Sequence, residues 1–524
     1  MSPLLAVARA HAPHIDWAGL SPLLALLGGA TVVLLAGLIG GRAARHHLVP
    51  FLSVVSFGAA IGCAIWQWDE RGSLIEGALA LDPLTLLVVL IVGVAGIATT
   101  LLAWRDQAAR EVAHGEFFAL LLTSAAGMVV LGAAQNLVST FVGLELLSLP
   151  LYILCASRMR SERSLEAGLK YLIIGSVGSA TLLYGFALLY GATGATDYEG
   201  IARAAARSGM TTDVLFLTGV ALSVVGLAFK SSLAPFHQWT PDVYEGAPTP
   251  VTAFMSVATK VAAFAATIRL FDVALGGTFE DWKPLWEVLA VTSILVGNVG
   301  ALGQTSLKRM LAYSSIAQAG YLLVGFVVGT AGGVEAVMYY LVVYLFANLA
   351  AFAVVIARER ETDAEDDMAA LRGLGSANPL LATVMTFAML SLAGIPAMAG
   401  FIGKFNLISA AVDGGLTWLG IVIVIGSMIS LAYYLPVVAA MWGGGEPMPA
   451  RPQEDPRTGL PAMAGADPEA DDLAIEEPVD APRRAGIEVT IAAALLGLAT
   501  LVFGIVPQPL FDLVDGAARG LGLS

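Results

Sequence analysis

The sequence predicts an all-α polytopic membrane protein with about fourteen transmembrane helices. Three observations support this fold class: 57% of the 524 residues are hydrophobic, only 13% are charged, and long apolar stretches recur along the chain. Soluble domains carry about 25% charged residues, roughly twice this share. Because the loops between the apolar stretches are short, we expect residues 1–524 to form a single membrane domain.

The individual membrane helices follow from the lengths of the apolar stretches. A helix needs about 18–25 apolar residues to cross a bilayer. We expect such helices at 20–41, 48–67, 81–103, 117–133, 137–156, 168–190, 212–233, 249–272, 285–303, 311–329, 334–357, 379–401, 416–442 and 486–506.

The positions of lysine and arginine predict the orientation of these helices. Alternate loops, counted from the first span, contain Arg42 and Arg45, Arg105 and Arg110, Arg158, Arg160 and Arg163, Lys308 and Arg309, Arg358 and Arg360, and Arg483 and Arg484. Positive loops face the cytoplasm, so both termini are expected on the outer side. Residues 443–485 are rich in Pro, Asp and Glu and are therefore expected to form an acidic, disordered cytoplasmic loop.

Composition and motifs exclude several classes of function for this chain. The net charge is −14, and clustered lysine and arginine of the kind that binds nucleic acid is absent. Two cysteines, Cys63 and Cys155, lie far apart, so the chain offers no iron–sulfur ligand set. We find no glycine-rich nucleotide motif and expect no metal site. Any redox cofactor is expected on other chains.

Two of the predicted helices are interrupted. In the seventh span Lys230 precedes Pro235, and in the twelfth Pro396 precedes Lys404. Broken helices at corresponding positions in two halves indicate a transport pathway. Spans four to eight and nine to thirteen then form two five-helix repeats. In each repeat the broken helix is the fourth of the five. Because each repeat contains an odd number of spans, one repeat is inverted in the membrane relative to the other. The predicted division is 1–116 with three helices, 117–272 and 285–442 as the repeats, 443–485 as the acidic loop, and 486–524 with the last helix.

Four ionisable residues, Glu145, Lys230, Lys260 and Lys404, lie deep within predicted spans. A charge at the centre of a membrane helix costs about 2.5–3.5 kcal/mol, so four of them indicate a function. Burial disfavours the charged form of a lysine, and a nearby carboxylate favours it. A lysine between these two influences can therefore take up and release a proton.

Each of these residues also has a plain structural interpretation. Glu145 and Lys230 would form a static ion pair, Lys260 would extend to the membrane surface, and Lys404 would lie near the outer face.

Three further polar residues near the spans remain open to two interpretations or favour the structural one. Lys170 is expected to be an interfacial anchor, and His237 is equally compatible with a proton relay and a structural role. Asp82, which precedes a proline, is expected to cap the third helix.

Long segments of the sequence resemble a known family. "FKSSLAPFHQWTPDVYEGAPTPVTAFMSVATKVAAF", "FVGLELLSLPLYIL", "LKRMLAYSSIAQAGYLLVG" and "GIPAMAGFIGKF" resemble, in matching order, the subunit N family of proton-pumping NADH–quinone oxidoreductase, respiratory complex I. The resemblance covers most of 117–442. It implies fourteen helices with two inverted five-helix repeats, each containing a broken helix, in a bacterial inner membrane.

The resemblance also implies roles for individual residues. It assigns proton translocation to Glu145, Lys230, Lys260 and Lys404. It assigns a secondary proton path to Lys170 and His237. Two positions depart from the family pattern: Thr259 replaces a frequent proline, and Gln318 replaces a frequent histidine, which argues against a relay role at position 318.

The resemblance implies that this chain couples quinone reduction elsewhere in a complex to proton pumping. That complex is expected to use NADH, FMN, iron–sulfur clusters and quinone on other subunits, with none of these cofactors in this chain. Expected partners are the antiporter-like subunit M, the small subunit K, the lateral helix of subunit L, and lipid. One alternative is a subunit of a multisubunit Na⁺(K⁺)/H⁺ antiporter or a related membrane-bound hydrogenase, and another is a scaffold with inert ion pairs.

Overall fold

The computed structural model describes residues 15–39, 41, 44–207, 209–362, 366–444 and 485–519. Most of the predicted acidic loop at 443–485 lies outside the described residues. Within them, twelve helices are long and apolar enough to cross a membrane, and two shorter apolar helices, Val214–Lys230 and Pro379–Ala393, are the first parts of the two predicted broken helices. The prediction of about fourteen membrane helices is therefore confirmed.

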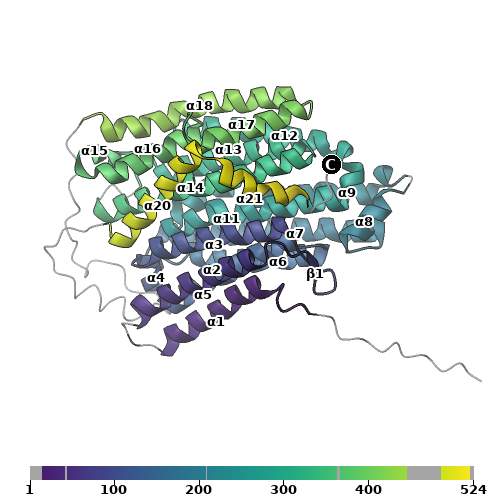
Figure 1. The fold of residues 1–524 in the computed structure, drawn as a ribbon, viewed down its shortest axis with the longest axis horizontal. Coiled ribbons are helices and arrows are strands. Elements are labelled where there is room, and N and C mark those ends of the chain that lie inside the picture. The colour runs from purple at the N-terminus through teal and green to yellow at the C-terminus, as the bar shows by residue number, and fades with distance from the viewer. Residues whose placement is uncertain are drawn as a thin grey trace, which may run out of the picture.

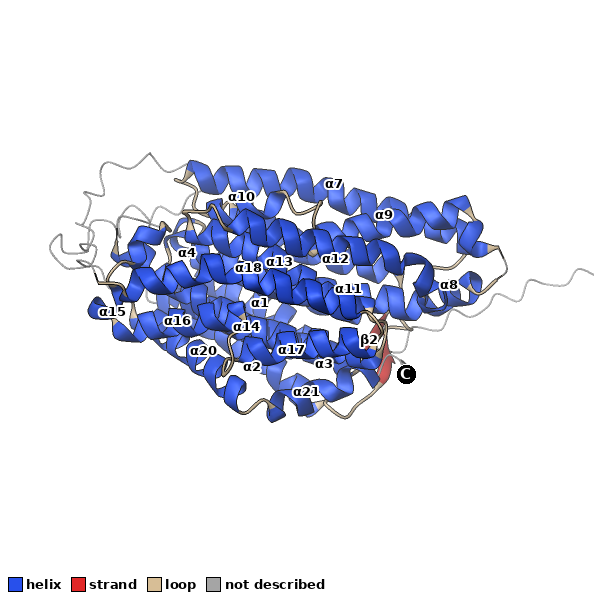
Figure 2. Cartoon of the chain, turned by 90° about the horizontal axis from the view of Figure 1, so that it is seen from above, coloured by secondary structure: helices blue, strands red, loops and turns tan. Residues whose placement is uncertain are grey.

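The helices run roughly along the long axis of the molecule, with α4 and α15 at one end and α8 and the two strands at the other (Figures 1 and 2). The α-helices are α1 (Ser21–Ile39), α2 (Val49–Trp66), α3 (Pro83–Ala103), α4 (Gln107–Glu111), α5 (His114–Ala133), α6 (Leu137–Cys155), α7 (Glu162–Thr193), α8 (Tyr198–Ala205), α9 (Val214–Lys230), α10 (Trp239–Gly246), α11 (Thr249–Ile268), α12 (Phe279–Ala301), α13 (Leu307–Val327), α14 (Ala331–Glu361), α15 (Leu374–Ala377), α16 (Pro379–Ala393), α17 (Ala399–Asp413), α18 (Thr417–Trp442), α20 (Ile487–Ile505) and α21 (Gln508–Arg519). Strands β1 (Gly72–Leu74) and β2 (Leu79–Leu81) pair antiparallel, and a π-helical turn, η3 (Arg269–Ala274), continues α11.

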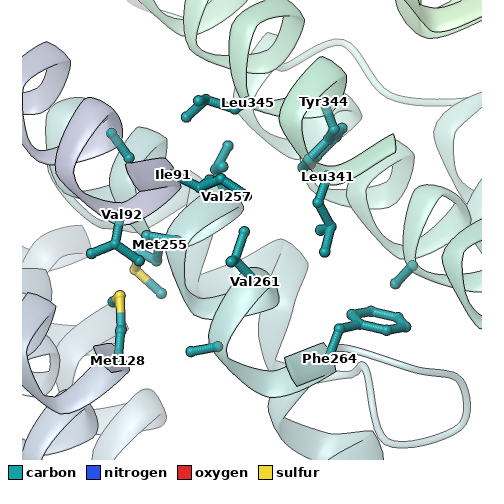
Figure 3. Packing of buried hydrophobic residues seen from close by; sticks show 14 of the residues in the cluster. Ile91, Val92, Met128, Met255, Val257, Val261, Phe264, Leu341, Tyr344 and Leu345 are labelled. Atoms are coloured by element: carbon teal, nitrogen blue, oxygen red, sulfur yellow. The ribbon is translucent and has the colours of Figure 1, made fainter. Parts of the chain in front are cut away.

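Helix α11 is the centre of the bundle. Every one of its residues is buried, and it contacts α3, α5 and α14. Figure 3 shows Val257 and Val261 of α11 between Ile91 of α3 and Leu341 of α14. A helix that is apolar on all sides belongs in the interior, so any polar residue on α11 is shielded from bulk solvent.

The two predicted repeats are built from the same pairs of helices. Helix α5 packs on α6 as α12 packs on α13, and α11 lies against α5 as α18 lies against α12. The fourth position of the first repeat is the pair α9 and α10, and that of the second is α16 and α17. Each repeat therefore contains one helix that stops inside the protein and restarts.

Side-chain caps fix where several membrane helices begin. Asn136 accepts a hydrogen bond from the Ser139 backbone N–H at 2.7 Å at the start of α6, and Asp213 does the same for the Phe216 N–H at 3.0 Å at the start of α9. Such caps satisfy backbone donors that have no partner inside the helix.

The twelfth predicted span, 379–401, begins where α16 begins, at Pro379, but its predicted end is too early. Helix α16 ends at Ala393, and α17 then runs to Asp413 with Lys404 inside it. Gly394 adopts a φ of +85°, which favours glycine, and Pro396 lacks a backbone N–H. The helix therefore stops at Ala393 and restarts at Ala399.

A C-terminal helix, α21, was not predicted. Its Leu510 and Val514 are buried, and Phe511 stacks on Tyr339 of α14 with ring centroids 4.6 Å apart. Because its other face is polar, the segment lacks the continuous apolar character used to find membrane helices. Its apolar residues recur every three or four positions and so form one face that packs on α14, although the segment as a whole is not strongly hydrophobic.

The arginine-rich loops meet at one end of the bundle. Arg158 lies 3.3 Å from Asp106 and 4.0 Å from Glu359, and Arg360 lies 3.7 Å from Glu488. These residues belong to four different connections between spans, so the alternate loops do share one end. Burial acts to raise the pKa of Asp106, but the charges of Arg158 and Arg360 hold it below its usual range.

Asp106 should make the stability of this end depend on pH. A carboxyl group whose folded pKa is lowered stabilises the fold above its unfolded pKa of about 3.9 and loses that contribution as pH falls further. Near neutral pH, we expect Asp106 to stay ionised and the thermal inactivation temperature to be constant. At pH values below about 4, this temperature should decrease as Asp106 loses its charge. The variant Asp106→Asn should flatten this acid-side decrease, and an unchanged pH profile in that variant would contradict the assignment.

A buried ion pair fixes the other end of α11. Arg269 of η3 donates to both Asp82 carboxylate oxygens at 2.8 and 2.6 Å, and to the Gly132 carbonyl at 2.5 Å. Asp82 also accepts from the Thr85 backbone N–H at 2.9 Å. The predicted cap is therefore confirmed, and Arg269 additionally holds α3, through Asp82, and α5, through Gly132, to the end of α11.

Removing the arginine of this pair should be strongly destabilising. Arg269→Met leaves the Asp82 carboxylate buried without its cation, which costs about 3–5 kcal/mol. The matched control is Lys283→Met, because Lys283 pairs at 3.2 Å with the exposed Glu280 and surface pairs contribute about 0–1 kcal/mol. Thermal unfolding of the purified assembly should separate the two variants, and equal midpoints would show that the buried pair is dispensable.

Candidate functional site

Lys230 ends α9 at the first break and is buried, with 3% of its surface exposed. Its ammonium donates to the Ser148 hydroxyl of α6 at 2.8 Å and to the Tyr171 hydroxyl of α7 at 3.1 Å. The Tyr171 ring stacks on Trp239 of α10, with centroids 4.7 Å apart. The break therefore brings Lys230 between three helices and gives it two neutral acceptors.

Glu145 lies one helical turn before Ser148 on α6. It forms no ion pair within 4 Å among the described residues, so the expected Glu145–Lys230 contact is absent in this conformation. One of its carboxylate oxygens is buried with no hydrogen-bond partner in the described chain. Glu145 can therefore act on Lys230 through space, but not through a direct salt bridge.

Lys260 lies at the middle of α11 with 1% of its surface exposed. Its ammonium donates to the Ser315 hydroxyl of α13 at 2.6 Å, and Tyr344 of α14 donates to the same oxygen at 2.9 Å. No described carboxylate lies within ion-pair distance of Lys260. Lys260 therefore does not extend to the membrane surface but points to Ser315 inside the bundle.

Lys404 occupies α17, just after the second break, and is 4% exposed. It donates to the carbonyl oxygens of Leu392 and Ala393, at 2.8 and 3.2 Å, and lies 4.7 Å from the centre of the Tyr321 ring. These carbonyls end α16, and the last carbonyls of a helix lack intrahelical donors and carry partial negative charge. The break therefore creates the acceptors for this ammonium group.

Hydrogen bonds of Gln318 reach the acceptor of Lys404 from a position one helical turn away from the acceptor of Lys260. On α13, Gln318 lies one turn after Ser315, and its amide oxygen accepts from Tyr340 at 2.5 Å. Its amide nitrogen donates to Tyr434 and to the Leu392 carbonyl, both at 3.3 Å. Leu392 is also an acceptor of Lys404, so Gln318 lies between the two lysines.

Between Lys230 and Lys260 the described side chains are aromatic. Tyr171, which contacts Lys230, stacks on Trp239, and Trp239 packs against Tyr244 with ring centroids 6.2 Å apart. Tyr244 in turn lies near Ser315, the acceptor of Lys260. The contacts of this first interval are therefore between aromatic rings, whereas those of the second are hydrogen bonds of Gln318.

Lys170 and His237 lie outside this row. Lys170 is partly exposed and pairs with Glu166 at 2.8 Å and with Asp242 at 3.0 Å, as an interfacial anchor would. Asp242 also accepts from Arg309 at 2.8 Å. One ring nitrogen of His237 is buried without a partner in the described chain, and no described hydrogen bond connects His237 to the three lysines.

Sequence reasoning missed the acceptors of the lysines. Ser148, Tyr171 and Ser315 look like ordinary residues of apolar helices, and Gln318 was taken as evidence against a role at its position. The available signal was spacing, because Ser148 follows Glu145 by one turn and Gln318 follows Ser315 by one turn. Among the residues that the structure describes, no group of three or more His, Cys, Asp or Glu could hold a metal ion.

A bundle with two broken helices and a row of buried lysines defines an antiporter-like membrane protein. Residues 134–430 match the family described as NADH:quinone oxidoreductase/Mrp antiporter, transmembrane. The chain belongs to this family.

Its relatives include proteins named NADH-quinone oxidoreductase subunit N. The protein from Salinispora arenicola is 40% identical, with 97% of this chain and 98% of that protein covered, and "subunit N 2" from Roseiflexus castenholzii is 38% identical, with 97% of each covered. A chain of respiratory complex I from Thermus thermophilus superposes with a TM-score of 0.76 at 31% identity, covering 94% of this chain and all of that one. A chain of the Mrp complex from Dietzia sp. gives 0.81 at 25% identity, covering 95% and 97%.

The contacts of Gln318 can be measured by a double-mutant cycle. Gln318→Leu leaves the Tyr340 hydroxyl without its acceptor, which should cost about 1–3 kcal/mol. Because the two residues touch, Gln318→Leu and Tyr340→Phe should be non-additive by about 0.5–3 kcal/mol in thermal or denaturant unfolding. The control cycle pairs Gln318→Leu with Tyr198→Phe, because the Tyr198 hydroxyl bonds Thr140 in the other repeat. In this cycle the two losses of unfolding free energy should add within about 0.5 kcal/mol. Additivity in both cycles would contradict the described contact.

Proposed function

We propose that this chain is the proton-translocating membrane subunit N of a NADH–quinone oxidoreductase. The observation that carries the proposal is that Lys230, Lys260 and Lys404 are all buried and all donate only to neutral acceptors. A lysine paired with a carboxylate is held in its charged form, whereas a lysine facing hydroxyls and carbonyls can exist in either form. Three such lysines in a row are suited to passing a proton.

In the proposed mechanism, quinone reduction elsewhere changes the charge near Glu145. Glu145 has no described salt bridge to hold it, so a charged neighbour can change the position of its side chain. The altered field then changes the protonation of Lys230, and the charge on Lys230 acts on Lys260. A proton on Lys260 passes by way of water and the groups around Gln318 to Lys404, and from there to the outer side.

The energy required is compatible with these groups. Moving one charge against about 200 mV needs roughly 4.6 kcal/mol. Burying an ammonium group without a carboxylate costs several kcal/mol, so changing its surroundings by one nearby charge has the same scale. The complex is expected to use NADH, FMN, iron–sulfur clusters and quinone on its other subunits.

A partner subunit is proposed to cover the outer face of α6. Val142 and Leu149 are about half exposed on this face, and Glu145 lies between them at helical spacing. A carboxyl group surrounded by lipid is costly, which favours a protein neighbour there. We propose the small subunit K or the antiporter-like subunit M for this position, with the lateral helix of subunit L elsewhere on the surface and lipid on the remaining apolar faces.

We further propose that the basic end of the bundle is cytoplasmic in a bacterial inner membrane. The support is the clustering of arginine and lysine from alternate connections at that end. With fourteen crossings, both termini would then lie on the outer side.

Replacing the buried lysines should abolish pumping. In inside-out vesicles that contain the whole complex, Lys230→Ala, Lys260→Ala and Lys404→Ala should each lower NADH-driven proton uptake by roughly tenfold or more, because each removes a proton carrier. Lys283→Ala, at an exposed pair, should pump normally. Native gels establish that each variant assembles. Near-normal pumping by assembled Lys260→Ala would refute the proposal.

The second candidate is a Na⁺(K⁺)/H⁺ exchanger, which the superposition on the Mrp complex chain supports. Relatives at 38–43% identity named as oxidoreductase subunits make it the weaker candidate. Cation-driven proton flux without NADH and quinone would favour the exchanger.

A further inference from the structure

A stripe of hydroxyl side chains leads along the buried helix α11 to Lys260. Thr249, Thr252 and Ser256 precede Lys260 at spacings of three, four and four residues, and the three hydroxyl residues are completely buried. Residues three and four apart share one face of a helix. The stripe therefore runs from the start of α11, at the arginine-rich end of the bundle, to the central lysine.

Polar residues of α14 lie opposite this stripe. Thr249 donates to the Glu359 carboxylate at 2.7 Å, and Asn348 donates to the Ser256 hydroxyl at 2.5 Å. Four residues before Asn348, Tyr344 donates to the acceptor of Lys260. Glu359 and Asn348 are eleven residues apart on α14, as Thr249 and Lys260 are on α11, so the polar contacts between the two helices lie about 16 Å apart. Residues 349–357 of α14 between them are apolar, and Thr252 of α11 lies in this interval.

Asn348 has an unsatisfied acceptor in this interface. It is completely buried, its amide nitrogen donates to Ser256, and its amide oxygen has no hydrogen-bond partner among the described residues. Leaving a buried carbonyl oxygen unpaired costs about 1–3 kcal/mol, and ordered water is the usual donor to such groups. Asn348 is thus suited to hold a water molecule one helical turn from Lys260.

Glu359 lies where this interface reaches the end of the bundle. Its side chain is 13% exposed, and the Lys308 ammonium and an Arg158 nitrogen each lie 4.0 Å from it. Lys308 itself is buried and donates to the Ala247 carbonyl at 2.7 Å, so it is more than a positive loop residue. Glu359 is therefore a polar group where the interface reaches the end of the bundle, with two cations beside it.

We propose that a second proton entrance runs along the α11–α14 interface from Glu359 past Asn348 to Lys260. This inference rests on the proposed function and adds a route that does not pass through Lys230. A proton from the solution is taken up near Glu359, moves along water held by Asn348 and Ser256, and protonates the neutral amine of Lys260. Asn348 is a positioning residue, since it orients water and carries no proton itself. Lys230 then acts on Lys260 through its charge and is not its only proton donor.

The test uses the whole complex in inside-out vesicles. Asn348→Leu and Ser256→Ala should lower the protons pumped per NADH oxidised by about tenfold, with the deficit growing between about pH 6 and pH 8.5, as protons become scarce. Thr267→Val is the matched control: it also removes a buried hydroxyl from α11, but on the far side of Lys260, and it should pump normally. Glu359→Gln keeps a hydrogen-bond acceptor for Thr249 and should show the same pH-dependent deficit as the interface variants.

The outcomes separate this inference from the proposed function. If the interface variants pump like Thr267→Val while Lys260→Ala does not pump, the entrance is refuted and the proposed function stands. If Lys260→Ala also pumps, the proposed function fails. Should Asn348→Leu not assemble, Ser256→Ala carries the test. A density map of the complex that resolves ordered water should show a water molecule bonded to the Asn348 amide oxygen, and a dry interface in such a map would overturn the inference.

Discussion

The structure depends on three lysine ammonium groups that are buried without a carboxylate partner. Transferring a charge into a protein interior costs several kcal/mol, and ion pairing is the usual compensation. Here the compensation comes from hydroxyl groups for Lys230 and Lys260, and from carbonyls for Lys404. These acceptors stabilise the charged form less than a carboxylate does and serve the neutral form almost equally well. The proposed function depends on this absence of a carboxylate, because it lets each lysine exist with or without its proton.

The broken helices are the architectural source of this balance. A continuous helix uses its carbonyls internally, so it offers a lysine no backbone acceptor. The stop at Ala393 frees the last carbonyls of α16 for Lys404, and the stop at Lys230 places that side chain between α6 and α7. The fully buried α11 keeps bulk water away from Lys260, and the Arg269–Asp82 pair holds its end in place. Fold and chemistry are thus supplied by the same helix endings.

The lysines and the breaks could be predicted from the sequence because both violate strong rules. A charge such as Lys260 inside an apolar stretch, and a proline such as Pro396 within a span, stand out from their surroundings. The acceptors could not be predicted, because Ser148 and Ser315 are unremarkable in composition and become significant only when another helix brings a lysine to them. The static Glu145–Lys230 ion pair, the plain structural interpretation, is not found among the described contacts, and the sequence could not decide this because it gives the depth of a residue but not the direction of its side chain.

The two intervals between the lysines differ in kind, and this difference bears on how the charge moves. From Lys260 to Lys404 the interval contains hydroxyl and amide groups around Gln318, which can orient water in either direction. From Lys230 to Lys260 the described contacts run through the stacked rings of Tyr171 and Trp239. Charge acts across an apolar interval of low dielectric constant more strongly than across water, whereas a proton crosses it less readily. The aromatic interval therefore favours electrostatic influence of Lys230 on Lys260, and the polar interval favours transfer of the proton itself. In the proposed mechanism, this order of intervals would separate the signal that drives transport from the path that carries the proton.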